Sequence, residues 1–333
     1  MAAKSHNHTL AGLSVLAVGQ TIATRIAASW LAECGAKVCL RHPPSTTESG
    51  PFAAQTLRMI SSELDGPPDA VIGDTAALAE LDPVEAANAT RVTITSPLPA
   101  TGDYTDSLID DMTLYARSGL GYLTHELDEL GEFGDFCLPR NRQASILAGM
   151  AAATAVACAA IEGRPEPRTI NIDQLEVLSL MPMQPVAFAQ MSDLLMGKPA
   201  PRSGPRVPGG TLPTSNGMSY VRPVEPAHWS VLFRVIGELD WAADLMDADP
   251  QPATIREHGD AIDVRMREWA AGLTSEDLCD ACQAEHVPVA PVYRPDQVVT
   301  DAHLNARSFF RDDGLNLPWL STFGAATDGS RPA

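Results

Sequence analysis

The stretch LSVLAVGQTIATRIAASWLAECGAKVCL, residues 13–40, decides the fold of this chain. It begins with a short apolar run, Leu13–Val18, that ends in a glycine. Residues Ile22–Cys34 then show helical periodicity, Gly35 ends the helix, and Ala36–Leu40 is apolar again. A strand, a helix and a second strand in so short a segment form a βαβ unit, which implies a parallel sheet with a right-handed crossover.

Two later apolar runs, Ala70–Ile72 and Arg91–Thr95, are predicted as further buried strands, and Thr169–Ile172 as a short strand. The pattern predicts a doubly wound α/β domain, in which ligands bind beyond the carboxyl ends of the strands. An Ala-rich helix is predicted from about Gln143 to Gly163. It is long enough to span a membrane, but its Ala, Thr and Gly content favours a buried helix in a soluble protein.

The second half of the chain changes composition. Lys198–Pro213 is dense in Pro and Gly, which favours a linker or a covering loop. After it we expect a strand at Met218–Val221, and helices at Pro226–Ile236, about Ile255–Ala271, and Ser275–Glu285. The last helix opens with Thr274 and Asp277 at capping-box spacing. The predicted organisation is a large Rossmann-like domain at 1–185, a linker at 186–213, a small domain at 214–294 and a C-terminal return at 295–333.

Composition limits the possible partners. The 333 residues carry a net charge of −19, which argues against a nucleic acid or an anionic membrane as partner. The length exceeds the roughly 250–300 residues at which one core stops growing, so two domains are expected. Six cysteines without a secreted-framework spacing favour reduced thiols. The first ten residues lack an apolar signal-peptide core, so we expect a cytoplasmic protein.

Several segments, in order, resemble a known family. One segment is similar to the corresponding family segment without a gap: residues 96–120, SPLPATGDYTDSLIDDMTLYARSGL. LPRNRQASILAGMAAATAVACAAIEGR resembles the segment with its catalytic aspartate, and INIDQLEVL the strand and helix after it. The residues kept in the first segment are Gly102, Tyr104, Asp106, Asp111, Ser118 and Gly119.

The family is that of the family III CoA-transferases (CaiB/BaiF type), with formyl-CoA transferase and α-methylacyl-CoA racemase, and this chain resembles a divergent member. The resemblance implies a Rossmann-like doubly wound large domain with an inserted smaller α+β domain. It also implies two chains that interlock like rings. We therefore expect a homodimer, or a heteromer with a catalytic paralogue.

The resemblance also locates the nucleophile, an aspartate four residues before a helix glycine. Counting back from Gly149 gives Ser145, and no acid lies between Asp135 and Glu162. Transfer needs a side-chain acyl carbon that bears CoA as a thioester, and a hydroxyl has none. Serine accepts only an acyl group, and no His or carboxylate adjacent in sequence offers itself as a base. The sequence predicts that CoA transfer by this chain alone is lost.

The CoA-binding side differs from the family as well. Thr24-Arg25 replaces the family's Gly-Pro turn, and Leu40-Arg41-His42 replaces its Lys-x-Glu. Thr21, Ile22 and Ala23 still occupy the turn where family members contact the adenine end of CoA. Arg25 and Arg41 are either new phosphate contacts, since guanidinium groups suit phosphates, or surface residues. We expect no tightly bound cofactor, and CoA or acyl-CoA as the ligand.

Three other features have two interpretations each. His125 could act with Asp128, Glu129 or Asp135 as an acid–base set for proton transfer at the α-carbon of a substrate. Alternatively, these residues belong to a polar exposed loop. The spacing of Cys279, Cys282 and His286 favours a core stripe of one helix over a metal site, so no metal is predicted. Pro208-Gly209-Gly210 is a lid or a linker.

Three classes of function remain open. The favoured one is a subunit of the family that lacks the nucleophile and pairs with a catalytic paralogue in acyl-CoA metabolism. The second is a stand-alone isomerase or lyase that uses a repurposed pocket on an acyl-CoA or another carboxylic metabolite. The third is a non-catalytic acyl-CoA-binding protein.

Overall fold

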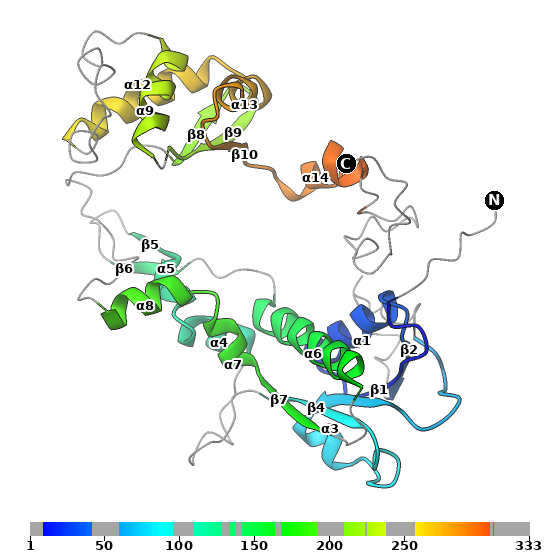
Figure 1. Cartoon of the computed structure of the whole chain (residues 1–333). Helices are drawn as coiled ribbons and strands as arrows, with labels where there is room; N and C mark the ends of the chain where they lie inside the picture. Colours follow the sequence, from blue (N-terminus) through cyan, green and yellow to red (C-terminus); the bar gives the residue numbers. More distant parts are fainter. Residues whose placement is uncertain are drawn as a thin grey trace, which may run out of the picture. The chain divides into compact units, whose positions relative to one another are not determined.

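The chain divides into two compact units, described separately below (Figure 1). The first comprises Met1–Pro199 and His303–Ala333, and the second comprises Ala200–Ala302. The computed structural model describes residues 9–41, 60–95, 110–127, 133–136, 142–163, 168–191, 210–223, 225–237, 257–306 and 309.

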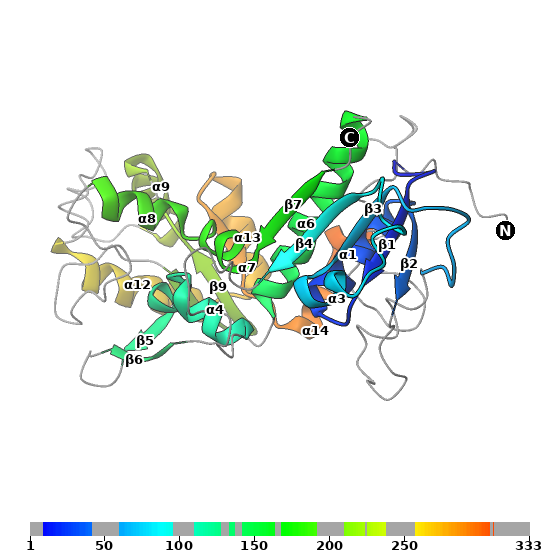
Figure 2. The same ribbon diagram turned by 90° about the horizontal axis from the view of Figure 1, so that it is seen from below.

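A five-stranded parallel sheet forms the centre of the first unit (Figure 2). Its strand order is β2-β1-β3-β4-β7, so the chain adds strands first on one side of β1 and then on the other. The strands are β1 (Ser14–Val18), β2 (Lys37–Arg41), β3 (Ala70–Asp74), β4 (Thr90–Thr95) and β7 (Thr169–Asp173). This is the doubly wound sheet that the sequence predicts, and its order reverses between β1 and β3.

The first βαβ unit is confirmed. Helix α1 (Ile22–Glu33) begins after Thr21, whose hydroxyl accepts the backbone N–H of Thr24 at 3.3 Å. Gly19 links β1 to this helix with a φ of +109°. A Cβ at this position would lie 2.5 Å from a carboxylate oxygen of Asp74, so only glycine fits the turn.

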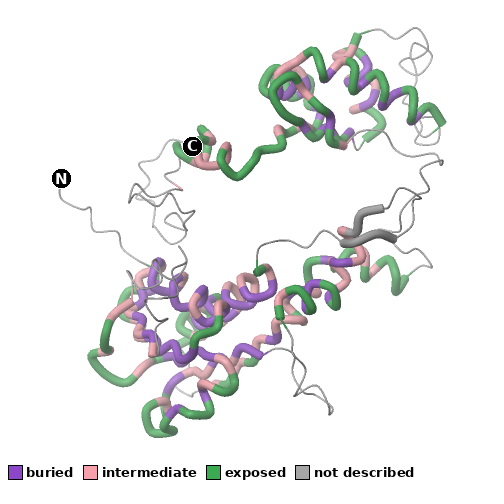
Figure 3. Tube along the Cα trace, turned by 180° about the vertical axis from the view of Figure 1, so that it is seen from behind, coloured by how far each residue is buried: buried purple, intermediate pink, exposed green. Residues whose placement is uncertain are grey.

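Alternating side chains give the sheet two different faces. Val15, Ala17 and Val38 pack with α1 and the Ala-rich helix α6 (Gln143–Glu162). Leu16 and Val18 point the other way and pack around the short helix α3 (Thr75–Ala79). The buried residues of the first unit follow the sheet and the helices α1 and α6 (Figure 3).

Helix α6 is the only helix in the described part of the chain that is long and apolar enough to cross a membrane. Its small residues instead lie against α1: Ala148 and Ala152 are fully buried. A Cβ on Gly149 would lie 2.6 Å from the carbonyl oxygen of Ala23 and 2.7 Å from Cβ of Ile26. Small residues on one face of α6 therefore allow close packing against α1.

Shorter elements complete the first unit. Helices α4 (Asp111–Arg117) and α7 (Gln174–Ser179) both contact α6. Strands β5 (His125–Leu127) and β6 (Phe133–Phe136) form an antiparallel pair, so part of the predicted exposed loop is a hairpin. The remaining helices here are α5 (Leu120–Leu123) and α8 (Met183–Met191).

The second unit contains a three-stranded antiparallel sheet in the order β10-β9-β8. It comprises β8 (Gly210–Thr214), β9 (Gly217–Val221) and β10 (Val289–Pro291), with helices α9 (Pro226–Ile236), α12 (Gly259–Ala271) and α13 (Ser275–Ala284). Trp229, Phe233 and Met266 are in its core. The range 186–213, expected as a linker, includes the end of α8 and most of β8. Two short helices follow, α14 (Pro295–Val298) and α15 (Ala302–Ala306).

Candidate functional site

Ser145 lies in the first turn of α6 and is bound by the carboxylate of Asp111. Its hydroxyl donates to Oδ2 of Asp111 at 2.6 Å, and its backbone N–H donates to Oδ1 at 2.9 Å. Ser145 is 8% exposed, whereas Asp111 is half-buried. The two residues are 34 positions apart in sequence. The fold thus places a carboxylate beside the hydroxyl that the sequence predicts at the nucleophile position.

Two successive acids at the start of α4 have different roles. Asp110 caps its own helix: its carboxylate accepts the Thr113 N–H, while the Thr113 hydroxyl accepts the Asp110 N–H. Hydrogen bonding from Thr113 holds the pKa of Asp110 below its ordinary value. Asp111 is therefore available to α6, whose own N-cap residue, Arg142, makes no side-chain cap. The negative charge of Asp111 at the N-terminus of α6 also suits the helix dipole.

The turn between β1 and α1 lies beside the same part of α6. Gly149, one turn after Ser145, is close to the carbonyl of Ala23. Thr21 is exposed at this turn, Ile22 is half-buried and Ala23 is buried. The contact of α1 with α6 therefore places Ala23, one of the predicted CoA-binding residues, beside Gly149 of α6.

Arg25 and Arg41 have different surroundings. Arg25 is half-buried within α1. Arg41 makes a two-point contact with Glu85, at 2.8 and 3.2 Å, and this hydrogen bonding raises the pKa of Arg41. Successive residues of a strand face opposite sides of the sheet. Leu40, the neighbour of Arg41 in β2, packs on the α1 side. Its side chain thus belongs to the sheet face opposite Ser145.

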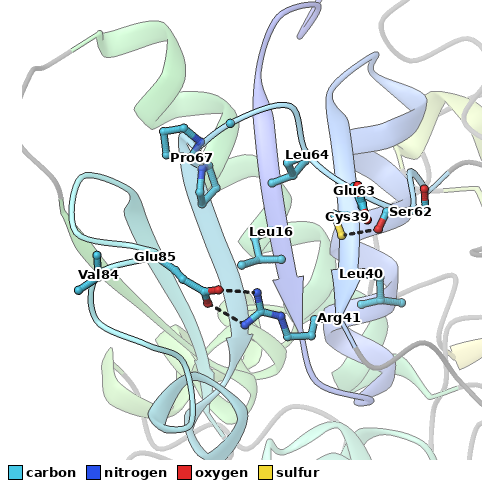
Figure 4. Close-up of a pocket in the computed structure, with 12 residues that line it drawn as sticks. Leu16, Cys39, Leu40, Arg41, Ser62, Glu63, Leu64, Pro67, Val84 and Glu85 are labelled. Atoms are coloured by element: carbon cyan, nitrogen blue, oxygen red, sulfur yellow. Dashed lines mark hydrogen bonds and ion pairs between the residues drawn. The ribbon is translucent and has the colours of Figure 1, made fainter.

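A cavity of about 530 Å³ surrounds this ion pair on the α3 side of the sheet. Leu16 and Cys39 form part of its wall, and Figure 4 shows the guanidinium of Arg41 facing the carboxylate of Glu85. The thiol of Cys39 donates to the carbonyl of Ser62 at 3.5 Å. Since Glu85 neutralises Arg41, an anion that binds here must compete with a carboxylate already in place.

Two further predicted residues lie on the paired strands β5 and β6. His125 is in β5 and Asp135 is in β6, with His125 paired to Phe136 across the hairpin. The alternative partners Asp128 and Glu129, and the glycines at 208 and 209, lie outside the described residues.

The cysteines of α13 are core residues. Cys282 is fully buried and Cys279 is 7% exposed, while His286 is exposed beyond the helix end with a φ of 61°. Burial raises the pKa of Cys282 to about 11 and also raises that of Cys279. Metal binding requires thiolates, so these thiols suit packing. Within the described ranges, no group of three or more His, Cys, Asp or Glu residues could hold a metal ion.

The sequence did not predict a role for Asp111 at Ser145. A base was expected only among the residues adjacent to Ser145 in sequence, whereas Asp111 lies 34 positions away. The available signal was the occurrence of Asp111 among the residues kept in the segment 96–120.

Comparisons with known proteins agree with this architecture. Residues 96–322 match the family model described as CoA-transferase family III. The chain is similar to the crystal structure of Rv3272 from M. tuberculosis, with 15% identity, a TM-score of 0.71, and coverage of 92% of this chain and 89% of that one. It is also similar to a CAIB/BAIF family protein from Brucella suis, with 17% identity, a TM-score of 0.69, and coverage of 92% and 89%.

A search of curated proteins found no match. At such identities the structural likeness establishes the fold, while the sequence match covers more than half of the chain and includes both Asp111 and Ser145. This chain belongs to CoA-transferase family III.

Proposed function

We propose that this protein is an acyl-CoA-binding subunit of a family III CoA-transferase-type enzyme, and that it does not transfer CoA by itself. Family membership supports a CoA thioester as the ligand. The turn Thr21–Ala23 beside α6 is the CoA-binding region expected from the family, and its backbone is ordered by the Thr21 cap.

One observation carries the proposal: position 145 has a hydroxyl, and this hydroxyl is bound to Asp111. In the family's reaction the carboxyl carbon of an aspartate first takes up CoA as a thioester and then passes it to the acceptor acid. An ester on Ser145 has its carbonyl on the acyl side, so CoA cannot remain on the protein while the acid is exchanged. A subunit of this kind needs a partner chain with an intact aspartate in order to transfer CoA.

The experiment measures binding and transfer separately. Purified protein is titrated with CoA and acetyl-CoA in a thermal-unfolding assay, in which ligand at 100 times its dissociation constant stabilises by about 2.7 kcal/mol. Transfer of CoA from acetyl-CoA to succinate is then assayed, with and without a co-expressed family member that retains the aspartate. We expect stabilisation, no transfer by the chain alone, and co-elution with the partner in size exclusion. Rapid transfer by the purified chain alone would refute the proposal.

A further inference from the structure

The contact between Ser145 and Asp111 has the geometry of a nucleophile with its base. The distance of 2.6 Å from Oγ to Oδ2 lies within the 2.6–3.2 Å, approximately, that is expected for an activated hydroxyl. The second bond, from the Ser145 N–H to Oδ1, fixes the plane of the carboxylate. The base is thus oriented by the residue that it activates.

The position of Ser145 in α6 favours attack on a carbonyl. Ser145 is the third residue of a 20-residue helix, and the N–H groups of the first turn have no acceptor within the helix. Asp111 accepts a hydrogen bond from the Ser145 N–H. Gln143 and Ala144 precede Ser145 in the same turn. The positive end of the helix dipole stabilises negative charge that develops on a substrate oxygen.

The enclosure of the pair also suits this chemistry. Ser145 is 8% exposed, so little bulk water competes for its hydrogen bond to Asp111. Arg142, which precedes the helix, is exposed. Helix α6 therefore begins with a solvent-exposed residue directly before the turn that contains Ser145.

We propose that Ser145 and Asp111 form a nucleophile–base pair that hydrolyses acyl-CoA thioesters. Oγ of Ser145 attacks the thioester carbon as Asp111 takes the hydroxyl proton. The C–S bond then breaks, CoA leaves as a thiol with the proton from Asp111, and the acyl group remains on Ser145 as an ester. Water attacks this ester, gives its proton through Asp111 to Oγ, and releases the free acid. The sum is acyl-CoA plus water to acid plus CoA.

A weak base suffices here because of the leaving group. A free thiol has a pKa of about 8.5, so the thiolate leaves without a strong general acid. The change from aspartate to serine thus redirects the acyl group from exchange to hydrolysis. This inference rests on the acyl-CoA binding proposed above.

The test has two arms. In the first, acetyl-, octanoyl- and succinyl-CoA are supplied and free CoA is measured with a thiol reagent. In the second, p-nitrophenyl acetate is supplied and the peptide with residue 145 is examined by mass spectrometry for an acetyl group. The second arm does not depend on CoA binding. We expect release of CoA from at least one thioester and an acetyl adduct on Ser145.

Variants separate catalysis from folding. Asp111→Asn keeps an acceptor for the Ser145 N–H but cannot take a proton, and should lower kcat at least about 100-fold with KM little changed. Ser145→Ala should abolish the adduct. Thr154→Ala is the matched control, because it removes an exposed hydroxyl of the same helix that donates to the carbonyl of Met150. It should leave the rate unchanged.

The negative results for the nucleophile–base pair and for the proposed function can be distinguished. Wild-type protein that is stabilised by CoA but neither hydrolyses a thioester nor forms the adduct overturns the nucleophile–base pair, and leaves the proposed function standing. Asp111→Asn with wild-type kcat also overturns it. Protein that forms the adduct but is not stabilised by CoA or any acyl-CoA contradicts the proposed function alone.

Discussion

At the level of single residues, the contact between Asp111 and Ser145 depends on which side chain occupies position 145. A hydroxyl at position 145 donates a hydrogen bond to Asp111, whereas a carboxylate there would face a like charge at close range. The two Asp111 bonds also satisfy an N–H of α6 that the helix cannot satisfy itself. The contact thus stabilises the start of α6.

Restoring the family's aspartate should therefore be costly. We expect Ser145→Asp to lower the free energy of unfolding at pH 7 by roughly 1–4 kcal/mol relative to Ser145→Asn, because two carboxylates repel at a few ångströms. Urea unfolding of both variants measures the difference. The substitution should also fail to give robust CoA transfer. Equal stability of the two variants would show that the carboxylates avoid each other.

The sequence could not predict this contact, although it predicted Ser145 as the central position. Asp111 reaches Ser145 only because α4 packs on α6, and such a contact between distant segments has no local signature. The capping role of Thr274, in contrast, depends only on neighbouring residues, and Thr274 indeed accepts the N–H of Asp277. The segment with His125 and Asp135 shows another error. Its polar composition suggested a loop, whereas the structure has two antiparallel strands there, β5 and β6.

At the scale of elements, the contact of α1 with α6 positions the site. The approach is close because residue 149 is a glycine. The sequence predicted α1 from its periodicity, α6 from its Ala-rich composition and the strands from short apolar runs. It could not predict that Arg41 and Ser145 belong to opposite faces of that sheet, because the direction of a side chain depends on strand register.

Gly149→Ala tests this contact. Alanine favours the helix by about 1 kcal/mol, but its Cβ would lie 2.6 Å from a backbone oxygen, and overpacking costs about 1–3 kcal/mol. We expect a net loss in the free energy of unfolding. Gly66→Ala is the control, since its Cβ would meet nothing within 4 Å. A stabilised Gly149→Ala protein would mean that α1 and α6 separate without cost.

The buried thiol of α13 gives a pH-dependent prediction. Burial raises the pKa of Cys282 from 9.0 to about 11, so the folded state holds the proton more tightly than the unfolded state. The stabilisation is complete below pH 9 and is lost as the pH rises toward 11, by up to about 2 kcal/mol. Unfolding measured between pH 8 and 10.5 should therefore depend less on pH in Cys282→Ala. Parallel curves for the two proteins would contradict this.

At the scale of the whole molecule, helix α8 exposes apolar side chains. No residue of α8 is buried, and its apolar side chains include Met183 at 67% and Met191 at 87% exposed. Soluble monomers seldom expose contiguous apolar surface of this kind. The family resemblance implies an interlocked pair, and we expect a second subunit of this fold to cover α8.

Charged substitutions on this helix should disturb the assembly. We expect Met183→Glu combined with Met191→Glu to shift the molar mass in light scattering from dimer to monomer. Val264→Glu places the same charge at a 55% exposed site of the second unit and serves as the control. A double variant that remains dimeric would exclude α8 from the interface.

The mass of the covalent intermediate distinguishes an acyl ester on Ser145 from a CoA thioester on a carboxylate. Protein is mixed with excess acyl-CoA, quenched in acid within the first turnover, and weighed intact by mass spectrometry. A side chain without a carbonyl cannot hold CoA as a thioester, so we expect an increase equal to the acyl group less one hydrogen, located on Ser145. An increase equal to CoA less one water, located on Asp111 or any other carboxylate, would contradict it.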